Sequence, residues 1–413
     1  MKTLFVIIFC ISSFWSNLLQ AQVGSFTFNS PRETVVEIPF QMVSNLILIK
    51  LSVNGSDSMN FILDSGVRRT ILLDTLMLDR SSLKYSIPVM LRGFGQEFDL
   101  QAYLSTGNYI NLPGLTGRNQ WICVIRQGKN EFSQRMGTKI HGIIGCDFFS
   151  QFVVEIKYDE KILKIRKPCD RTARRIRSYH FIPLKFEDEK PVIELSINQK
   201  DTTKNKIRAL VDTGLSDAIW AFTFADPSIT VPEKNFETIL GGGLNGDIIG
   251  NAGRIPKISI SDFSLVDVMA AFPDSNSIGG TRNILGRQAS IGNELLRRFS
   301  VVFDYQNLRI GFKKGKCFKQ SFKYNRSGID LIAKMPGLPI YEVSEIRKNS
   351  PADRAQLKIG DMIIKVQGEE CLDKKLDEVY DLLNPDKARK VKLQVMRNGL
   401  TQKMILDAGN ELD

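Results

Sequence analysis

Short apolar runs rich in Val, Ile, Leu and Phe recur along most of the chain and are separated by polar turns. The run 46–51 is one example, and Asn54-Gly55 after it is a hairpin-turn signal. Apolar residues take a helical spacing only briefly, for about two turns after Gly145 and after Gly292. The pattern predicts a mainly β chain with short strands and few helices.

Two of these apolar strands end in the same triplet, an aspartate followed by a hydroxyl residue and a glycine. The triplets are Asp64-Ser65-Gly66 and Asp212-Thr213-Gly214, with their aspartates 148 residues apart. Either triplet alone is ordinary turn chemistry, because short polar side chains and Gly satisfy backbone groups where a strand ends. The repetition requires a further explanation.

A second pair of matching stretches indicates an internal duplication. Segments 142–158 and 289–305 align with a shift of 147 residues, so that Gly145 matches Gly292. Between these anchors, Gly93 and Gly241 each follow their aspartate by 29 residues. We expect each to lie at a hairpin tip, where Gly supplies positive backbone angles. Order-preserving matches at nearly constant offset are the mark of a repeated unit.

This doubled arrangement resembles the aspartic proteases, most closely the bacterial retropepsin-like group, over about residues 30–312. The resemblance implies a bilobal aspartic-protease fold made of two duplicated β-rich lobes, with Asp64 and Asp212 as the catalytic pair. Ser65 and Thr213 would bond across the two turns, and the glycines of the triplets would let the backbone approach the carboxylates. The residues implied to form flaps over the substrate are Gly93, Phe94, Gly95, Gly241 and Gly242.

The implied chemistry requires neither a metal nor a cofactor. Two carboxyl groups held close cannot both ionise, so they share a proton; one acts as base on water while the other donates to the substrate carbonyl. Aspartic proteases are the established example of this pairing, so the resemblance supplies the mechanism. The chain departs from the family at Arg68 and Arg69, where small or hydroxyl residues are usual. Arg68 would either lower a catalytic pKa or point into solvent.

Residues 324–408 resemble a PDZ domain of bacterial type, a small α+β fold. The segments that carry the resemblance are 337–343 and 349–368, followed by an expected helix over 372–383 and an expected closing strand over 391–397. A PDZ domain binds a peptide as an added strand. The implied peptide-binding residues are Gly337, Leu338, Pro339 and Ile340. Because Pro339 has no N–H to donate, an internal segment or the protein's own catalytic part is an alternative to a free C-terminus.

Composition and the first residues bear on compartment and partners. The chain has 413 residues, 43% of them hydrophobic and 24% charged, which is typical of globular proteins. Its net charge of +11 is not interleaved with aromatic residues, so we expect no nucleic-acid partner. Residues 1–22 carry Lys2 and an apolar run typical of a secretory signal. We therefore expect an exported bacterial protein, periplasmic or secreted, with no transmembrane anchor.

The sequence contains few residues or motifs that would support another kind of catalysis. There is no Gly-x-Ser-x-Gly, P-loop or His-Glu-x-x-His motif, and the cysteines lack the CxxC spacing of a zinc site. Cys146 and His141 could be imagined as a dyad, but the repeat places Asn293 at the position of Cys146, which favours a core or surface thiol. Cys169 and Cys317 each follow the last strand of a repeat, so a disulfide and two free thiols both remain open.

The expected organisation is a signal peptide (1–22), a first lobe (23–168), a basic linker (169–180), a second lobe (181–315), a linker (316–323) and a PDZ domain (324–408). The expected function is an aspartic endopeptidase whose PDZ domain binds substrate or partner peptides. The alternative is a catalytically inactive, exported peptide-binding or scaffolding protein that retains a protease-like fold. In both cases the expected partners are peptides or proteins.

Overall fold

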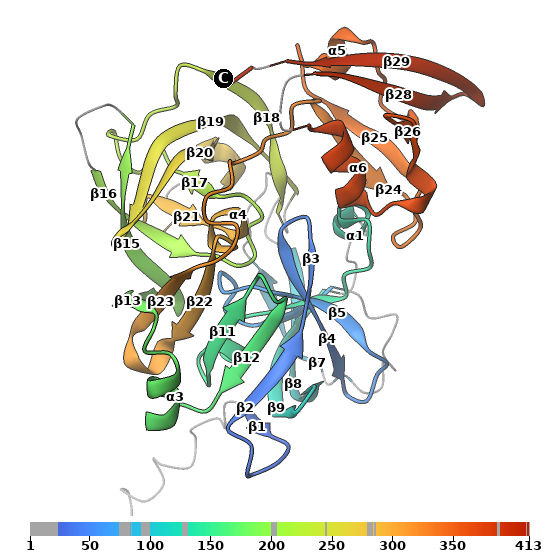
Figure 1. Ribbon diagram of the computed structural model, residues 1–413. Helices are drawn as coiled ribbons and strands as arrows, with labels where there is room; N and C mark the ends of the chain where they lie inside the picture. Colours follow the sequence, from blue (N-terminus) through green and yellow to red (C-terminus); the bar gives the residue numbers. More distant parts are fainter. Residues whose placement is uncertain are drawn as a thin grey trace, which may run out of the picture.

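The chain is mainly β and forms two lobes followed by a smaller C-terminal unit, which confirms the predicted fold class (Figure 1). The computed structural model describes residues 24–73, 83, 85–91, 100–125, 131–199, 205–243, 246–278, 284, 286–385, 389–409 and 411–412. The expected signal segment 1–22 lies outside these residues. None of the described helices is long and apolar enough to cross a bilayer.

The first lobe is built on one sheet of nine strands. These are β1 (Ser25–Phe28), β3 (Gln41–Val43), β4 (Leu46–Val53), β5 (Met59–Leu63), β6 (Thr70–Leu72), β7 (Tyr85–Leu91), β8 (Leu100–Leu112), β9 (Leu115–Val124) and β10 (Gly142–Ile144). Their order is β1-β9-β6-β10-β5-β4-β8-β7, with β3 beside β4. The long strand β8 also pairs with β9, so the sheet closes on itself.

The second lobe repeats this sheet. Its strands are β14 (Lys185–Glu187), β15 (Lys190–Asn198), β16 (Asn205–Val211), β17 (Ile219–Ala221), β18 (Asn235–Gly243), β19 (Gly246–Ile260), β20 (Phe263–Pro273) and β21 (Ala289–Ile291). The order β20-β17-β21-β16-β15-β19-β18 matches β9-β6-β10-β5-β4-β8-β7 strand for strand. As in the first lobe, one long strand, β19, pairs at both ends of the sheet. The duplication inferred from the sequence is therefore present in the strand order.

A six-stranded sheet joins the two lobes. Its strands are β2 (Val35–Pro39), β11 (Val153–Lys157), β12 (Ile162–Arg166), β13 (His180–Pro183), β22 (Phe299–Asp304) and β23 (Arg309–Lys314), in the order β13-β23-β22-β11-β12-β2. At its centre, Val154 lies opposite Phe303 and Ile156 opposite Val301. Since the shift of 147 residues takes Val154 to Val301 and Ile156 to Phe303, the two pairs interchange under a near-twofold axis.

The helices of the lobes are short. They are α1 (Glu131–Met136), α2 (Cys146–Phe149), α3 (Asp170–Arg175) and α4 (Asn293–Leu296), with 3-10 turns η2 (Ser275–Ile278) and η4 (Tyr305–Asn307). The expectation of two helical turns after Gly145 and Gly292 was too long, because Phe299 already begins β22 and Phe152 already leads into β11. Within the predicted basic linker, the chain forms α3. Cys169 and Cys317 are free thiols, so the disulfide alternative is not realised.

One hydrophobic core runs through both lobes and the sheet between them. Phe149 of the first lobe packs with its ring centroid 5.0 Å from that of Phe303 in the second lobe, and both side chains are fully buried. Burying apolar surface between lobes stabilises their mutual placement, at roughly 25 cal/mol per Å². This shared core fixes the geometry of any site that the lobes form together.

The C-terminal unit has its own sheet and its own core. Its elements are β24 (Ile329–Ala333), β25 (Tyr341–Ile346), α5 (Pro351–Arg354), β26 (Met362–Val366), β27 (Glu369–Glu370), η5 (Cys371–Asp373), α6 (Leu376–Leu383), β28 (Arg389–Arg397) and β29 (Leu400–Ala408). The helix expected over 372–383 begins later, at Leu376, because the residues before it form the 3-10 turn η5.

Candidate active site

The two aspartates of the triplets meet where the lobes face each other. Asp64 follows β5 and Asp212 follows β16, and each of these strands pairs in parallel with a short strand, β10 or β21. The Asp64 N–H donates to the Ile144 carbonyl at 3.0 Å, and the Asp212 N–H donates to the Ile291 carbonyl at 2.9 Å. Each aspartate is thus held by the equivalent strand of its own lobe.

Ser65 and Thr213 lock the two turns together across the lobe boundary. The Ser65 N–H donates to Thr213 Oγ1 at 2.9 Å, and the Thr213 N–H donates to Ser65 Oγ at 3.0 Å. Ser65 Oγ donates onward to the Val211 carbonyl at 2.6 Å, and Thr213 Oγ1 donates to the Leu63 carbonyl at 2.8 Å. Both side chains have no exposed surface. The four reciprocal bonds repeat the twofold relation of the lobes.

The glycines of the triplets leave room for the two carboxyl groups. A Cβ added to Gly66 would lie 2.7 Å from Asp212 Oδ1, and one added to Gly214 would overlap the Asp64 carboxyl group. Each glycine N–H also donates to the aspartate of its own triplet, at 2.6 Å to Asp64 Oδ1 and 2.9 Å to Asp212 Oδ1. Any side chain at either glycine would therefore push the carboxyl groups from their places.

Each of the two carboxyl groups changes the pKa of the other. Burial and then the charge of Asp212 raise the pKa of Asp64 well above its ordinary value, and the groups share a hydrogen bond. Burial also raises the pKa of Asp212, while the Gly214 N–H, the bond to Asp64 and the charge of Arg287 act in the opposite direction. These influences favour Asp64 as the protonated member and Asp212 as the ionised one.

Cys146 and Asn293 support the turns from behind, at equivalent positions of the two copies. Cys146 Sγ donates to the Ser65 carbonyl at 3.0 Å, and Asn293 Nδ2 donates to the Thr213 carbonyl at 2.6 Å. Burial raises the pKa of the Cys146 thiol far above its usual value, so the thiol stays protonated. Its bond gives the side chain a structural role that the repeat position alone did not specify.

Arg68 and Arg69, which follow the first triplet, form ion pairs with carboxylates other than the two candidates. Arg68 forms a bidentate ion pair with Glu189 on the turn between β14 and β15, with Nε and Nη2 each 2.7 Å from a carboxylate oxygen. Arg69 Nη1 lies 3.4 Å from Asp147 Oδ2, and its guanidinium stacks 5.0 Å from the Trp121 ring centroid. Of the two alternatives for Arg68, the structure has the side chain directed outward, where it links the lobes.

The hairpins expected to act as flaps are described only in part. Gly93, Phe94 and Gly95 lie outside the described residues. Gly241 and Gly242 lie on the arm of the β18–β19 hairpin, at a bulge, and not at its tip. The expectation of a positive φ at Gly241 was wrong; the residue with that conformation is Gly246, at φ +104°, which pairs with Gly243 beside the turn.

The second-lobe hairpin is tied to the first lobe by a residue that sequence reasoning missed. Arg135 on α1 donates from Nη2 to Asp247 Oδ1 on β19 at 2.6 Å. Its aliphatic portion approaches Gly242, where an added Cβ would lie 3.7 Å from Arg135 Cδ. The sequence alone does not predict this contact, because Arg135 and Asp247 lie far apart along the chain and in different lobes.

The predicted PDZ peptide-binding residues lie on the connection between β24 and β25. The Gly337 N–H donates to the Gly137 carbonyl of the first lobe at 3.0 Å, and the Ile340 N–H donates to the Leu338 carbonyl at 2.9 Å. Pro339 has no N–H. The backbone donors of Gly337 and Ile340 are therefore already used within the protein.

Besides the bond from Gly337 to Gly137, the C-terminal unit contacts the first lobe near α1 and near Ser44. Helix α1 packs beside β24, and Gln134 Nε2 donates to the Lys334 carbonyl at 3.2 Å (Figure 1). The Ser44 N–H donates to the Asp377 carboxylate on α6, at 3.0 Å to Oδ2. Between β24 and α6, the Tyr380 hydroxyl accepts a hydrogen bond from the Leu331 N–H at 2.7 Å.

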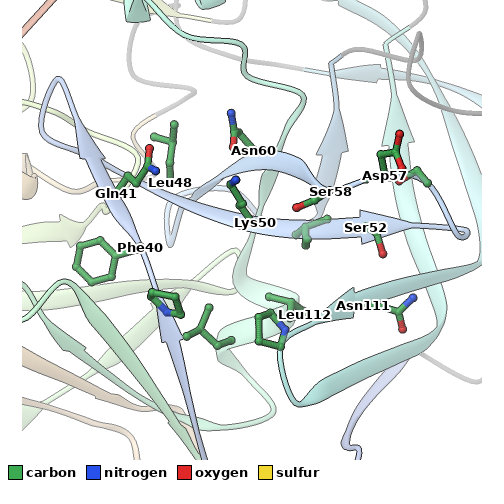
Figure 2. A pocket seen from close by; sticks show the side chains of 15 residues that line it. Phe40, Gln41, Leu48, Lys50, Ser52, Asp57, Ser58, Asn60, Asn111 and Leu112 are labelled. Carbon is green, nitrogen blue, oxygen red and sulfur yellow. Dashed lines mark hydrogen bonds between the residues drawn. The ribbon is translucent and has the colours of Figure 1, made fainter. Parts of the chain in front are cut away.

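A cavity of about 690 Å³ lies on the first lobe, between β3, β4 and the end of β8 (Figure 2). Leu48, Lys50 and Asn60 are among the residues that line it, and neither catalytic candidate does. Within the described part of the chain, no group of three or more His, Cys, Asp or Glu side chains is arranged to hold a metal ion. The carboxyl pair between the lobes is therefore the site with the most developed chemistry.

Comparison with known proteins assigns the C-terminal unit. A family model for the PDZ domain matches residues 325–407. This match confirms the PDZ prediction to within a residue at each end. No curated protein matches the chain.

Proposed function

We propose that this protein is an aspartic endopeptidase that hydrolyses peptide bonds with water activated between Asp64 and Asp212. The observation that carries the proposal is the convergence of two carboxyl groups from duplicated turns, where burial and the charge of Asp212 raise the pKa of Asp64. Such a pair is suited to acid-base work on a neutral carbonyl, because one member accepts a proton while the other donates one.

In the proposed reaction, ionised Asp212 removes a proton from water as the water oxygen bonds to the carbonyl carbon. Protonated Asp64 gives its proton to the carbonyl oxygen, which yields a neutral tetrahedral diol. The proton on Asp212 then passes to the leaving nitrogen while the C–N bond breaks, and a diol hydroxyl returns a proton to Asp64. The products are a carboxylic acid and an amine, and the pair regains its starting state with one proton.

The PDZ domain implies that the protein binds a peptide or protein partner. We propose that this partner is the substrate or a regulatory peptide, and that the protein acts after export. Contacts of α1 with both the PDZ domain and the β18–β19 hairpin support a link between partner binding and access to the carboxyl pair.

The test is hydrolysis of an unfolded protein of known sequence by the purified full chain between pH 3 and 8, with products identified by mass spectrometry. Asp64→Asn and Asp212→Asn should each lower the rate by at least about 100-fold, the scale of general acid-base catalysis. Asp267→Asn, which changes an exposed residue on β20, is the matched control and should retain activity. Undiminished turnover in either dyad variant would remove the proposed chemistry; absent turnover with retained peptide binding would favour the catalytically inactive binder.

A further inference from the structure

A buried cation in the second lobe has donors that no described residue uses. Arg287 is 2% exposed, and its Nε and Nη1 atoms have no hydrogen-bond partner among the described residues. Nearby along the chain, Ser290 is 1% exposed and its Oγ is likewise unpaired within the described part of the protein. Buried polar groups in native proteins are nearly always paired, so two such groups together require an explanation. A bound ligand that supplies the missing acceptors would account for both.

Both residues lie beside the carboxyl pair. Ser290 is on β21, directly before Ile291, whose carbonyl accepts the Asp212 N–H. Its neighbours Ala289 and Ile291 belong to the shared core, so strand alternation directs Ser290 to the opposite face. Arg287 precedes the same strand, and its charge is near enough to Asp212 to lower the pKa of that carboxyl.

The duplication shows what the first lobe has at the same positions. The shift of 147 residues matches Arg287 to Ile140 and Ser290 to Ile143. Both isoleucines belong to an apolar cluster of the first lobe. The two copies share their strand order and their turns but differ in polarity at these two positions, which hold isoleucines in the first lobe and an arginine and a serine in the second.

We propose that Arg287 and Ser290 form a binding subsite for an acidic side chain, Asp or Glu, of the peptide substrate. This proposal rests on the proposed peptidase function and adds a substrate class to it. A guanidinium group offers a planar fork of N–H donors that matches the two oxygens of a carboxylate, and the Ser290 hydroxyl supplies a further donor. The first-lobe side, with Ile140 and Ile143, receives an apolar side chain.

The test compares peptides that are identical except for Glu or Gln at one position next to the cleaved bond, with each of the two adjoining positions varied in turn. At one position the wild-type protein should cleave the Glu peptide with a kcat/KM about ten- to a hundredfold higher, the range expected for a charged hydrogen bond. Arg287→Gln should abolish this preference, Arg287→Lys should retain part of it, and Ser290→Ala should reduce it. Arg68→Gln, which alters an arginine already paired with Glu189, should keep it.

A different result would identify a purely electrostatic role for Arg287. If Arg287→Gln lowers kcat/KM equally for both peptides and shifts the pH profile, Arg287 acts on Asp212 alone and the subsite is overturned. A wild-type protein that cleaves the Glu and Gln peptides equally at both positions also overturns it.

The same peptides with a reduced, uncleavable bond separate this proposal from the peptidase proposal. Affinity measured by fluorescence anisotropy should favour the Glu peptide in the wild-type protein and not in Arg287→Gln. If no peptide is cleaved but this Arg287-dependent preference in binding persists, the subsite stands while the peptidase proposal fails. Cleavage without preference in either assay leaves the peptidase and removes the subsite. Circular dichroism of each variant establishes that its fold is intact.

Discussion

Replacing Thr213 with Val should remove hydrogen bonds that join the two turns that carry the carboxyl pair. Valine has nearly the shape of threonine but lacks the hydroxyl that accepts from the Ser65 N–H and donates to the Leu63 carbonyl. Both partners would be left unpaired in a fully buried place. Each unpaired buried group costs about 1–3 kcal/mol, so the free energy of unfolding should fall by about 2–6 kcal/mol.

Thr213→Ser provides the matched control, because it keeps the hydroxyl and removes only a methyl group. Its expected cost is about 1 kcal/mol. Urea denaturation followed by circular dichroism would rank the two variants, and peptide cleavage would be measured alongside. We expect Thr213→Val to lose both stability and activity and Thr213→Ser to keep most of each. Equal stability of the two variants would show that the cross-lobe hydrogen bonds contribute little.

Two further predictions concern charged groups near the site. Burial raises the pKa of Asp217, whose carboxylate accepts from Trp220 Nε1, to about 6. The folded protein therefore holds this proton where the unfolded chain has released it, so stability should fall by about 3 kcal/mol as the pH rises from 4 to 7. Asp217→Asn should flatten that dependence in urea titrations at several pH values; parallel curves for the two proteins would contradict it. Arg68→Ala should cost at most about 1 kcal/mol, because its pair with Glu189 is exposed, and should leave the pH profile of cleavage unchanged. A shift in the pH profile of cleavage would contradict this prediction, because it would show that the charge of Arg68 acts on the carboxyl pair.

The parts of the fold that were predictable from the sequence are those written as local or repeated patterns. The turn at Asn54-Gly55 and the two Asp-containing triplets follow from turn chemistry, and both positions of the turn have positive φ. The constant offset of 147 residues indicated the duplication, because a copied segment keeps its strand order even after its side chains diverge. The PDZ domain was identifiable for the same reason, since its strands and helices follow one another within a short stretch.

What the sequence did not reveal depends on contacts between distant segments. The bond from Cys146 to the Ser65 carbonyl and the pair between Arg135 and Asp247 join parts of the chain whose proximity only the folded lobes determine. Helix length after Gly145 was overestimated because Phe152 fits a helical spacing although it directly precedes β11. Arg287 was overlooked in the sequence. The repeat aligns it with the apolar Ile140, and a charged residue at a position that is apolar in the other copy could have drawn attention to it.

The pH dependence of peptide cleavage tests the shared proton most directly. A pair that works with one proton is inactive when both members are protonated and again when both are ionised, so kcat/KM should follow a bell-shaped curve. Its alkaline limb should reflect the raised pKa of Asp64. A rate that climbs steadily to a plateau at alkaline pH would contradict a mechanism in which Asp64 donates a proton.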